Sequence, residues 1–127
     1  YVHIASGNYN PATARIYTDV GLFTADDDIG EDVTNLFNYL TGYSKFSHYK
    51  RLMVAPMNLR KQFLALVDRE TRHAEAGYPA RIIAKMNSLT DLTMVESLYR
   101  ASRANVQIDL IVRGICILQP GIPGISE

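Results

Sequence analysis

Short alternations of apolar and polar residues open the chain and predict two strands joined by a polar turn. The first alternation covers residues 1–5, and the second covers residues 16–20. Apolar residues at every second position fit strands, and the Gly, Asn and Pro between them fit a turn. Because binding chemistry gathers at strand ends and in loops, residues 1–19 form a first candidate site. The chain also starts without a methionine, inside an expected strand, which predicts a piece of a larger protein.

A helical pattern follows the two expected strands. Apolar residues recur at spacings of three and four between positions 33 and 40. We expect Asp28 to cap the start of this helix with Glu31 as its capping-box partner, and Gly42 to end it. Residues 44–51 lose the helical period, and they predict a connection between two parts of the chain.

The second part of the chain repeats strand and helix patterns. Its expected strands are residues 52–55, 80–86 and 106–112, and its expected helices begin after Asn58 and after Thr90 or Asp91. Strand, helix and strand in succession predict a parallel sheet with right-handed crossovers. The fold class is therefore α/β. Within these elements we expect the side chains of Phe63 and Ile83 to be buried.

Polar side chains follow two neighbouring strands of this expected sheet. In such sheets ligands gather beyond the carboxyl ends of the strands, so Lys85, Asn87 and Arg113 are expected to face one cleft. Arg113 directly follows an apolar run, and its planar guanidinium suits a phosphate or a carboxylate. An ion pair between Arg113 and a neighbouring carboxylate is the alternative, and position alone does not separate the two readings.

Composition narrows the class of protein. The 13 basic and 13 acidic side chains leave no net charge, which gives no argument for binding nucleic acid or an anionic membrane. The single cysteine, Cys116, can form no internal disulfide and has no second cysteine at metal-ligand spacing. No apolar run reaches the ~20 residues of a membrane span. The sequence therefore predicts a cytoplasmic protein that binds no nucleic acid.

Four segments together resemble the bacterial polyphosphate kinase family, whose catalytic domains are similar to phospholipase D. They read YVHIASGNYNPATARIYTDVGLFTAD, RLMVAP, ARIIAKMNSLTD and IDLIVRGICILQPGIPGISE. The resemblance implies a phospholipase D-like α/β fold in three stretches. Residues 1–43 are the end of one catalytic subdomain, residues 44–51 a connection, and residues 52–127 the β-α-β-α-β start of a second catalytic subdomain.

The resemblance also implies an activity. The family transfers the terminal phosphate of ATP reversibly to inorganic polyphosphate through a phosphohistidine, which it places before Tyr1. A second important histidine is placed after Glu127. Magnesium is required, and we assign it no ligand in this chain. The implied partners are ATP, ADP and polyphosphate, and the parent enzyme is expected to be a homo-oligomer, associated with membranes without a transmembrane span.

Two alternatives to the enzyme stay open at this point. One is a noncatalytic α/β module that binds a phosphate or a nucleotide, and the other is a structural interaction domain without a ligand. Because the phosphorylated histidine lies outside the chain, we expect the isolated fragment to be inactive under either the enzyme or the module interpretation.

The resemblance assigns supporting roles to residues of the opening stretch. His3 matches the histidine of the family's H-x-G-T-G-N-Y-N segment, and Ser6 and Asn8 offer a hydroxyl and an amide around the phosphate. The chain departs from this segment at Ala5, which replaces glycine, and at Ser6, which replaces threonine. These residues are expected to support the phosphorylated histidine rather than to act as the nucleophile.

Two further residues match family positions that contact ATP. Tyr17 is the tyrosine of the A-R-x-Y-T-D segment, and Arg113 is the arginine of the V-R-G segment. Tyr17 offers a ring face and a hydroxyl, and Arg113 can neutralise phosphate charge. Arg15, Lys85 and Asn87 are candidates for binding polyphosphate. Asp19 is expected to orient Arg15 or to cap a turn.

Overall fold

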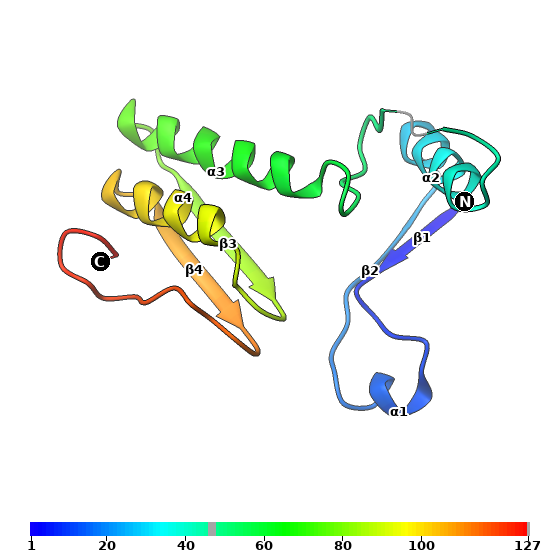
Figure 1. The fold of residues 1–127 in the computed structure, drawn as a ribbon, viewed down its shortest axis with the longest axis horizontal. Helices are drawn as coiled ribbons and strands as arrows, with labels where there is room; N and C mark the ends of the chain where they lie inside the picture. Colours follow the sequence, from blue (N-terminus) through cyan, green and yellow to red (C-terminus); the bar gives the residue numbers. More distant parts are fainter. Residues whose placement is uncertain (46–47, 127) are drawn as a thin grey trace. The chain divides into compact units, whose positions relative to one another are not determined.

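The computed structural model describes residues 1–45 and 48–126 and divides the chain into two compact units, Tyr1–Val54 and Ala55–Glu127 (Figure 1). The first unit contains β1 (Val2–Ala5), α1 (Pro11–Ala14), β2 (Gly21–Thr24) and α2 (Asp27–Leu40). The second contains α3 (Leu59–Glu75), β3 (Arg81–Met86), α4 (Leu92–Arg103) and β4 (Gln107–Val112). The expected α/β class is confirmed.

The first unit begins with an antiparallel hairpin in which Val2 faces Thr24 and Ala5 faces Gly21. The expectation of a second strand over residues 16–20 is therefore wrong, since β2 begins at Gly21. The Asn-Pro pair explains the difference. The Asn10 side chain accepts hydrogen bonds from the amides of residues 12 and 13, so the pair starts the short helix α1 and lengthens the loop.

The N-cap of helix α2 lies two residues earlier than expected. Asp26 accepts the Ile29 amide at 3.0 Å and is the N-cap, so the expectation that Asp28 caps the helix is wrong. Asp26 has the extended backbone that a cap requires, whereas Asp28 already lies inside the first turn. At the other end Gly42 has a φ of 76°, which confirms its expected role as the left-handed stop.

The second unit is built on a parallel pair of strands. Arg81 faces Gln107 and Met86 faces Val112, which confirms the strands expected over 80–86 and 106–112. Alternate strand residues, among them Ile82, Leu110 and Val112, pack against a core on α3 and α4. That core contains Val67, Leu89, Val95, Leu98, Ala101 and Val106.

The opposite face of this sheet is exposed in the chain. Ile83 is 65% exposed and Ile111 is 59% exposed, so the expected burial of Ile83 is wrong. Phe63 on α3 is 44% exposed and was also expected inside. Both errors have one cause. An apolar side chain is buried only where another layer of the structure covers it, and α3 and α4 cover only one face of the β3–β4 sheet.

The strand expected over residues 52–55 is absent from the described part of the chain, so the second unit lacks the first strand of the expected β-α-β-α-β order. Instead of joining a ladder, the Leu52 amide donates to the Asp32 carboxylate at 2.9 Å. An apolar run of four residues cannot by itself specify a strand, because the ladder needs a partner.

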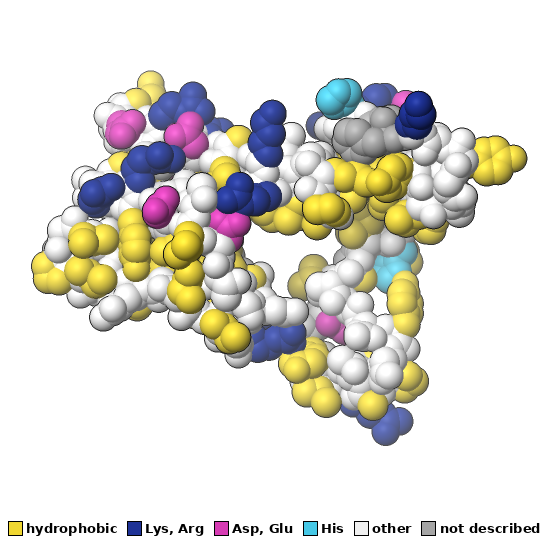
Figure 2. Space-filling model, in the orientation of Figure 1, with side chains coloured by type: hydrophobic (Ala, Val, Ile, Leu, Met, Phe, Trp, Pro, Cys, Tyr) yellow, Lys and Arg dark blue, Asp and Glu magenta, His cyan; other side chains and the backbone are white. Residues whose placement is uncertain are grey.

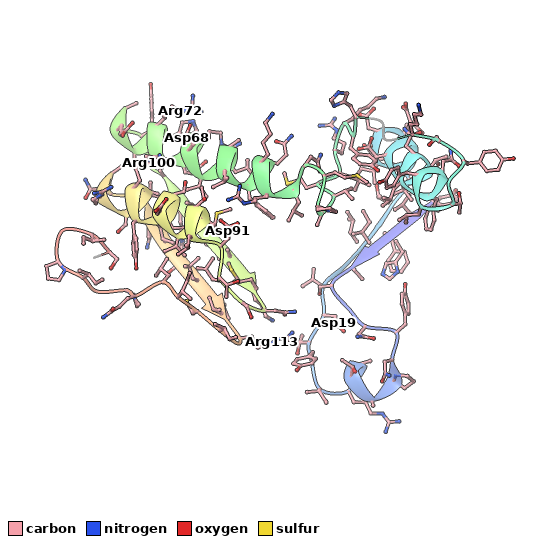
Figure 3. The ribbon with its side chains drawn as sticks, in the orientation of Figure 1. Asp19, Asp68, Arg72, Asp91, Arg100 and Arg113 are labelled. Atoms are coloured by element: carbon pink, nitrogen blue, oxygen red, sulfur yellow. The ribbon has the colours of Figure 1, made fainter. Side chains whose placement is uncertain are left out.

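Ion pairs cover the outer surface of α3 and α4, where basic and acidic side chains are mixed (Figure 2). Asp68 pairs with Arg72 at 3.2 Å and with Arg100 at 3.6 Å (Figure 3). Asp91 caps α4 by accepting the Met94 amide, which decides between the two expected caps. The Arg60 guanidinium also binds Asp91, and this hydrogen bond, with the Met94 amide, lowers the pKa of the carboxyl.

The two segments that leave β3 and β4 stay paired beyond the strands. The Arg113 amide donates to Met86 O at 3.1 Å, and the Gly114 amide donates to Asn87 O at 2.7 Å. This approach is so close that a Cβ atom on Gly114 would lie 2.9 Å from Asn87 O and 3.2 Å from Ser88 Oγ. Glycine is therefore required at position 114 for steric reasons.

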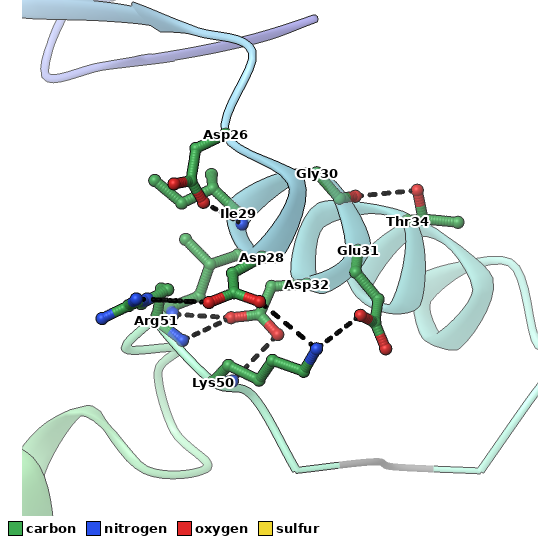
Figure 4. A network of polar contacts seen from close by, with 10 residues as sticks. Asp26, Asp28, Ile29, Gly30, Glu31, Asp32, Thr34, Lys50 and Arg51 are labelled. Carbon is green, nitrogen blue, oxygen red and sulfur yellow. Dashed lines mark hydrogen bonds and ion pairs between the residues drawn. The ribbon is translucent and has the colours of Figure 1, made fainter.

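Asp32 anchors the segment after α2 (Figure 4). Its side chain is buried, with 1% exposure, and it accepts the amides of Lys50, Arg51 and Leu52 at 2.9, 2.6 and 2.9 Å. Burial raises the pKa of this carboxyl, but the three amide hydrogen bonds outweigh burial and hold the pKa below its ordinary value. On the surface, Lys50 pairs with Glu31 at 2.7 Å.

We predict that Asp32→Asn lowers the free energy of unfolding of the first unit by about 3 kcal/mol, because three backbone amides lose a charged acceptor that is itself buried. Native-state hydrogen exchange of the α2 amides measures this change in free energy.

The contribution of Asp32 to stability also depends on pH. Since folding lowers the pKa of Asp32, its stabilisation of the first unit is complete above the unfolded pKa of about 4 and is lost as pH falls through the folded value. The Asn variant should lose this pH dependence. Glu31→Gln, which removes an exposed ion pair, should change stability by less than about 0.5 kcal/mol; equal effects would contradict the prediction.

We predict that Gly114→Ala destabilises the second unit by about 1–3 kcal/mol, because the new methyl group would meet a backbone oxygen. The matched control is Gly30→Ala in α2, where no atom lies within 4 Å of the added Cβ. That change should stabilise the first unit by roughly 0.5–1 kcal/mol, as alanine is favoured over glycine inside a helix. Hydrogen exchange of each unit measures both effects, and a neutral Gly114→Ala would contradict the close approach.

Candidate functional site

The loop between β1 and β2, residues 6–20, holds most of the candidates from the opening stretch. Ser6 joins the two ends of this loop: the Ser6 amide donates to Val20 O at 3.0 Å, and Ser6 Oγ accepts the Val20 amide at 3.0 Å. Asn8 Oδ1 accepts the Asn10 amide at 2.8 Å. Both side chains therefore shape the loop by binding its own backbone, and the remaining hydrogen-bonding groups of Ser6 and Asn8 are on an exposed segment.

His3 lies on β1 beside this loop and has a fixed ring orientation. Its imidazole stacks on Phe23 with ring centroids 4.2 Å apart and an interplanar angle of 9°. Its Nδ1 lies 3.4 Å from the Tyr9 hydroxyl. A Cβ atom on Gly21 would lie 3.1 Å from His3 Nε2, so the ring covers the backbone at this glycine. These contacts orient an exposed imidazole on the surface of the hairpin.

The far side of the loop carries Arg15, Tyr17 and Asp19. Arg15 follows α1 and is exposed, and Tyr17 is 45% exposed. The Asp19 carboxylate packs against Gly7, where an added Cβ would lie 3.0 Å from Asp19 Oδ2. Asp19 therefore lies against the backbone at Gly7, and its expected role of orienting Arg15 or capping a turn stays a prediction.

The carboxyl ends of β3 and β4 form the second group of candidates. Asn87 and Arg113 each follow a strand directly, and Arg113 Nη2 donates to Asn87 Oδ1. Figure 3 shows Arg113 at the end of β4. Lys85 lies opposite Ile111 on the exposed face of the sheet, one residue before β3 ends. Asn87 and Arg113 are therefore in contact, and the expectation that Lys85 faces one cleft with them stays a prediction.

The structure shows contacts of three residues that the sequence did not predict or left open. They are the packing of Asp19 on Gly7, the close approach at Gly114 and the backbone hydrogen bonds to Asp32. Gly114 had a usable signal, since it stands directly after an arginine that follows a strand. Asp32 also had one: it lies four residues before Leu36, on the apolar stripe of α2. An acid on an apolar helix face predicts a buried carboxylate with partners.

A hollow of 780 Å³ lies elsewhere in the second unit, between α4, β4 and the segment that follows Cys116. Leu98, Tyr99 and Leu110 line it, and neither Asn87 nor Arg113 does. Its walls are mainly apolar, which does not suit a phosphate. The candidate site at the strand ends is therefore an exposed set of polar groups rather than this hollow.

Across residues 1–45 and 48–126, no three His, Cys, Asp or Glu side chains gather in a way that could hold a metal ion. Within the same residues, no helix has the length and apolar character needed to cross a membrane.

Comparison with known proteins identifies the family. Residues 52–127 match the family described as polyphosphate kinase C-terminal domain 2, and residues 1–46 match polyphosphate kinase C-terminal domain 1. The chain is 56% identical over 127 residues to polyphosphate kinase of Synechocystis sp., and 52% identical to polyphosphate kinase 1 of Chlorobaculum tepidum. Both alignments span the whole of this chain but only 17% and 18% of the length of these two relatives.

A solved structure agrees with the sequence comparisons. The crystal structure of polyphosphate kinase from Porphyromonas gingivalis matches 96% of this chain and 19% of that one, with a TM-score of 0.88 and 43% identity. The two family models, the relatives that are more than 50% identical and the solved structure all point to the same family. The chain belongs to the polyphosphate kinase family.

Proposed function

We propose that the chain is part of a longer polyphosphate kinase that transfers the terminal phosphate of ATP reversibly to inorganic polyphosphate. The observation that carries this proposal is Arg113, whose guanidinium stands at the carboxyl ends of two parallel strands and is held there by Asn87. Ligands of α/β sheets bind at this edge. Family membership supports the reaction, and the small share of the relatives' length supports a larger parent.

In this proposal Arg113 neutralises negative charge on the transferring or leaving phosphate of ATP. Phosphoryl transfer depends mainly on positioning and on electrostatic stabilisation of the phosphate oxygens, and a guanidinium supplies both. Tyr17 offers its ring and hydroxyl to the nucleotide from the loop of the first unit. Arg15, Lys85 and Asn87 are proposed to contact the polyphosphate chain.

The phosphorylated histidine is proposed to lie outside this chain, in the parent protein. His3, Ser6 and Asn8 then support its surroundings, and the contacts that orient the His3 ring and shape the loop favour such a role. We also propose that the two units belong to two phospholipase D-like subdomains, residues 1–43 and 52–127. No residue of the chain is assigned to magnesium.

Three further properties of the parent rest on the resemblance alone. They are a homo-oligomeric state, a cytoplasmic location and association with membranes without a transmembrane span.

We predict that Arg113→Ala in the full-length enzyme lowers kcat/KM for ATP about a hundredfold or more, as expected for loss of a donor to a developing phosphate charge. Arg113→Lys should recover part of this loss, since it restores the charge without the planar fork. The matched control is Arg81→Gln, which breaks an exposed pair with Asp109 at the other end of β3 and should leave kcat/KM unchanged. Wild-type kinetics in Arg113→Ala would favour the structural interaction domain without a ligand.

We predict that the isolated 127-residue chain forms no phosphoprotein and no polyphosphate when incubated with radiolabelled ATP and magnesium, because the phosphorylated histidine lies outside it. Acid and base treatment of the washed protein identifies any phosphohistidine by its acid-labile label. The full-length enzyme is the positive control. A stable acid-labile phosphoprotein formed by the isolated chain would overturn the proposed position of the nucleophile.

A further inference from the structure

We propose that Tyr9 and Gly21 are positioning residues for His3, and that they act on the two nitrogen atoms of its imidazole ring. The Tyr9 hydroxyl binds Nδ1, and the absent side chain of Gly21 leaves the space that Nε2 occupies. The ring then offers Nε2 to a phosphate oxygen. The inference rests on the proposed function of His3 in the surroundings of the phosphorylated histidine.

Stacking on Phe23 fixes the plane of the His3 ring. The two residues face each other directly across the hairpin of β1 and β2, and their ring centroids lie 4.2 Å apart at an interplanar angle of 9°. A half-turn about the Cβ–Cγ bond of His3 keeps this plane but exchanges nitrogen and carbon atoms at the edge of the ring. The positions of the two nitrogens must therefore be set by contacts at that edge.

The Tyr9 hydroxyl distinguishes the two orientations of the ring. It lies 3.4 Å from His3 Nδ1, and the half-turned ring would present a carbon atom there, which accepts no hydrogen bond. The Tyr9 side chain is 90% exposed, so its hydroxyl contributes to no buried core. Because a neutral imidazole carries one proton, a hydroxyl that donates to Nδ1 leaves that proton on Nε2.

Gly21 admits the other nitrogen of the ring. A Cβ atom at position 21 would lie 3.1 Å from His3 Nε2, whereas its next neighbour, Ala5 Cβ, would be 3.7 Å away. Gly21 belongs to β2 and does not have the positive φ for which glycine is favoured. Glycine weakens a strand and often marks a place that another group approaches closely. The approach of the His3 ring therefore accounts for a glycine at this position.

Nε2 is the nitrogen of His3 that remains for a ligand. Among residues 1–45 and 48–126, no group forms a hydrogen bond with Nε2, and His3 is exposed. An N–H group at this atom can donate to a phosphate oxygen, and hydrogen bonds to a charged acceptor are stronger than neutral ones. A ring that is oriented before the ligand arrives loses less conformational freedom on binding.

The first test is Tyr9→Phe in the full-length enzyme, because this change removes only the hydroxyl. We expect kcat to fall about fivefold, as for the loss of one hydrogen bond, with KM for ATP and the melting temperature unchanged. The matched control is Tyr43→Phe in the same unit, whose side chain is 91% exposed and which should leave kcat unaltered. Wild-type kcat in Tyr9→Phe would overturn the inference. So would a raised KM for ATP at wild-type kcat, since it would mean that Tyr9 contacts the nucleotide directly.

The second test is Gly21→Ala, because the added methyl group forces the His3 ring to shift. We expect kcat to fall about threefold or more, since small displacements of a supporting group slow the reaction. The melting temperature should stay equal or rise, because alanine restricts the unfolded chain more than glycine does. Gly30→Ala, where no atom lies within 4 Å of the added Cβ, is the matched control and should leave kcat unaltered. Wild-type kcat in Gly21→Ala would contradict the proposed role of this glycine.

A double-mutant cycle separates action through His3 from an independent effect of Tyr9. In a His3→Gln background, Tyr9→Phe should slow formation of the phosphoenzyme from radiolabelled ATP no further, because the ring on which it acts is gone. A further loss of similar size in that background would overturn the inference. When His3→Gln leaves no measurable rate, Gly21→Ala decides: lowered kcat at unreduced melting temperature supports the inference, and wild-type kcat overturns it.

The outcomes also separate this inference from the proposed function. When His3→Gln lowers kcat but Tyr9→Phe and Gly21→Ala match the wild type, the role of His3 stands and the positioning roles are overturned. When His3→Gln has wild-type kcat, the proposed function of His3 fails and the inference fails with it. When Gly21→Ala lowers the melting temperature, Tyr9→Phe decides: lowered kcat at unchanged melting temperature supports the inference, and wild-type kcat overturns it.

Discussion

Parallel pairing between β3 and β4 is the constraint on which the candidate site depends. It sets Asn87 and Arg113, separated by 26 residues in sequence, at the same edge of the sheet. The pairing does not stop at the strand ends, since backbone hydrogen bonds continue to Gly114 and Leu89. A lone arginine after an apolar strand would otherwise be a flexible surface cation. Pairing fixes the backbone of Arg113 and brings its guanidinium beside the Asn87 side chain.

The first unit depends on a different interaction, the buried Asp32 carboxylate. One ionised side chain replaces a strand ladder as the acceptor for three successive amides, so residues 50–52 are fixed to α2 without regular secondary structure. The surrounding ion pairs of Lys50 and Arg51 are exposed and contribute less. Both units therefore fix an irregular segment in the same way, because the backbone amides of the segment donate to acceptors at fixed positions. In the first unit the acceptor is the Asp32 carboxylate, and in the second unit the acceptors are carbonyl oxygens at the end of β3 and in the turn after it.

Much of the second unit could be predicted from sequence. The strands over 80–86 and 106–112, the cap alternatives at residues 90 and 91, and the approach of Asn87 to Arg113 all follow from periodicity and from the geometry of parallel sheets. The first unit was predicted less well. Asn10 and Pro11 were read as a turn, although the same pair is also a good helix start, and this displaced the second strand. Burial of Ile83 was overestimated because an apolar strand residue does not reveal which face has a covering layer.

The sequence by itself determined the α/β class, most helix and strand positions, and the family, because these depend on local periodicity, on caps and on long motifs in order. Tertiary structure alone decided which of three aspartates caps α2, that Asp32 binds residues 18 to 20 positions away, and that the Arg113 guanidinium meets an amide instead of standing alone. The physical reason is the same in each case. A local pattern states which hydrogen-bonding groups a segment has, but the partner of each group is set by the distant segment that folding brings against it.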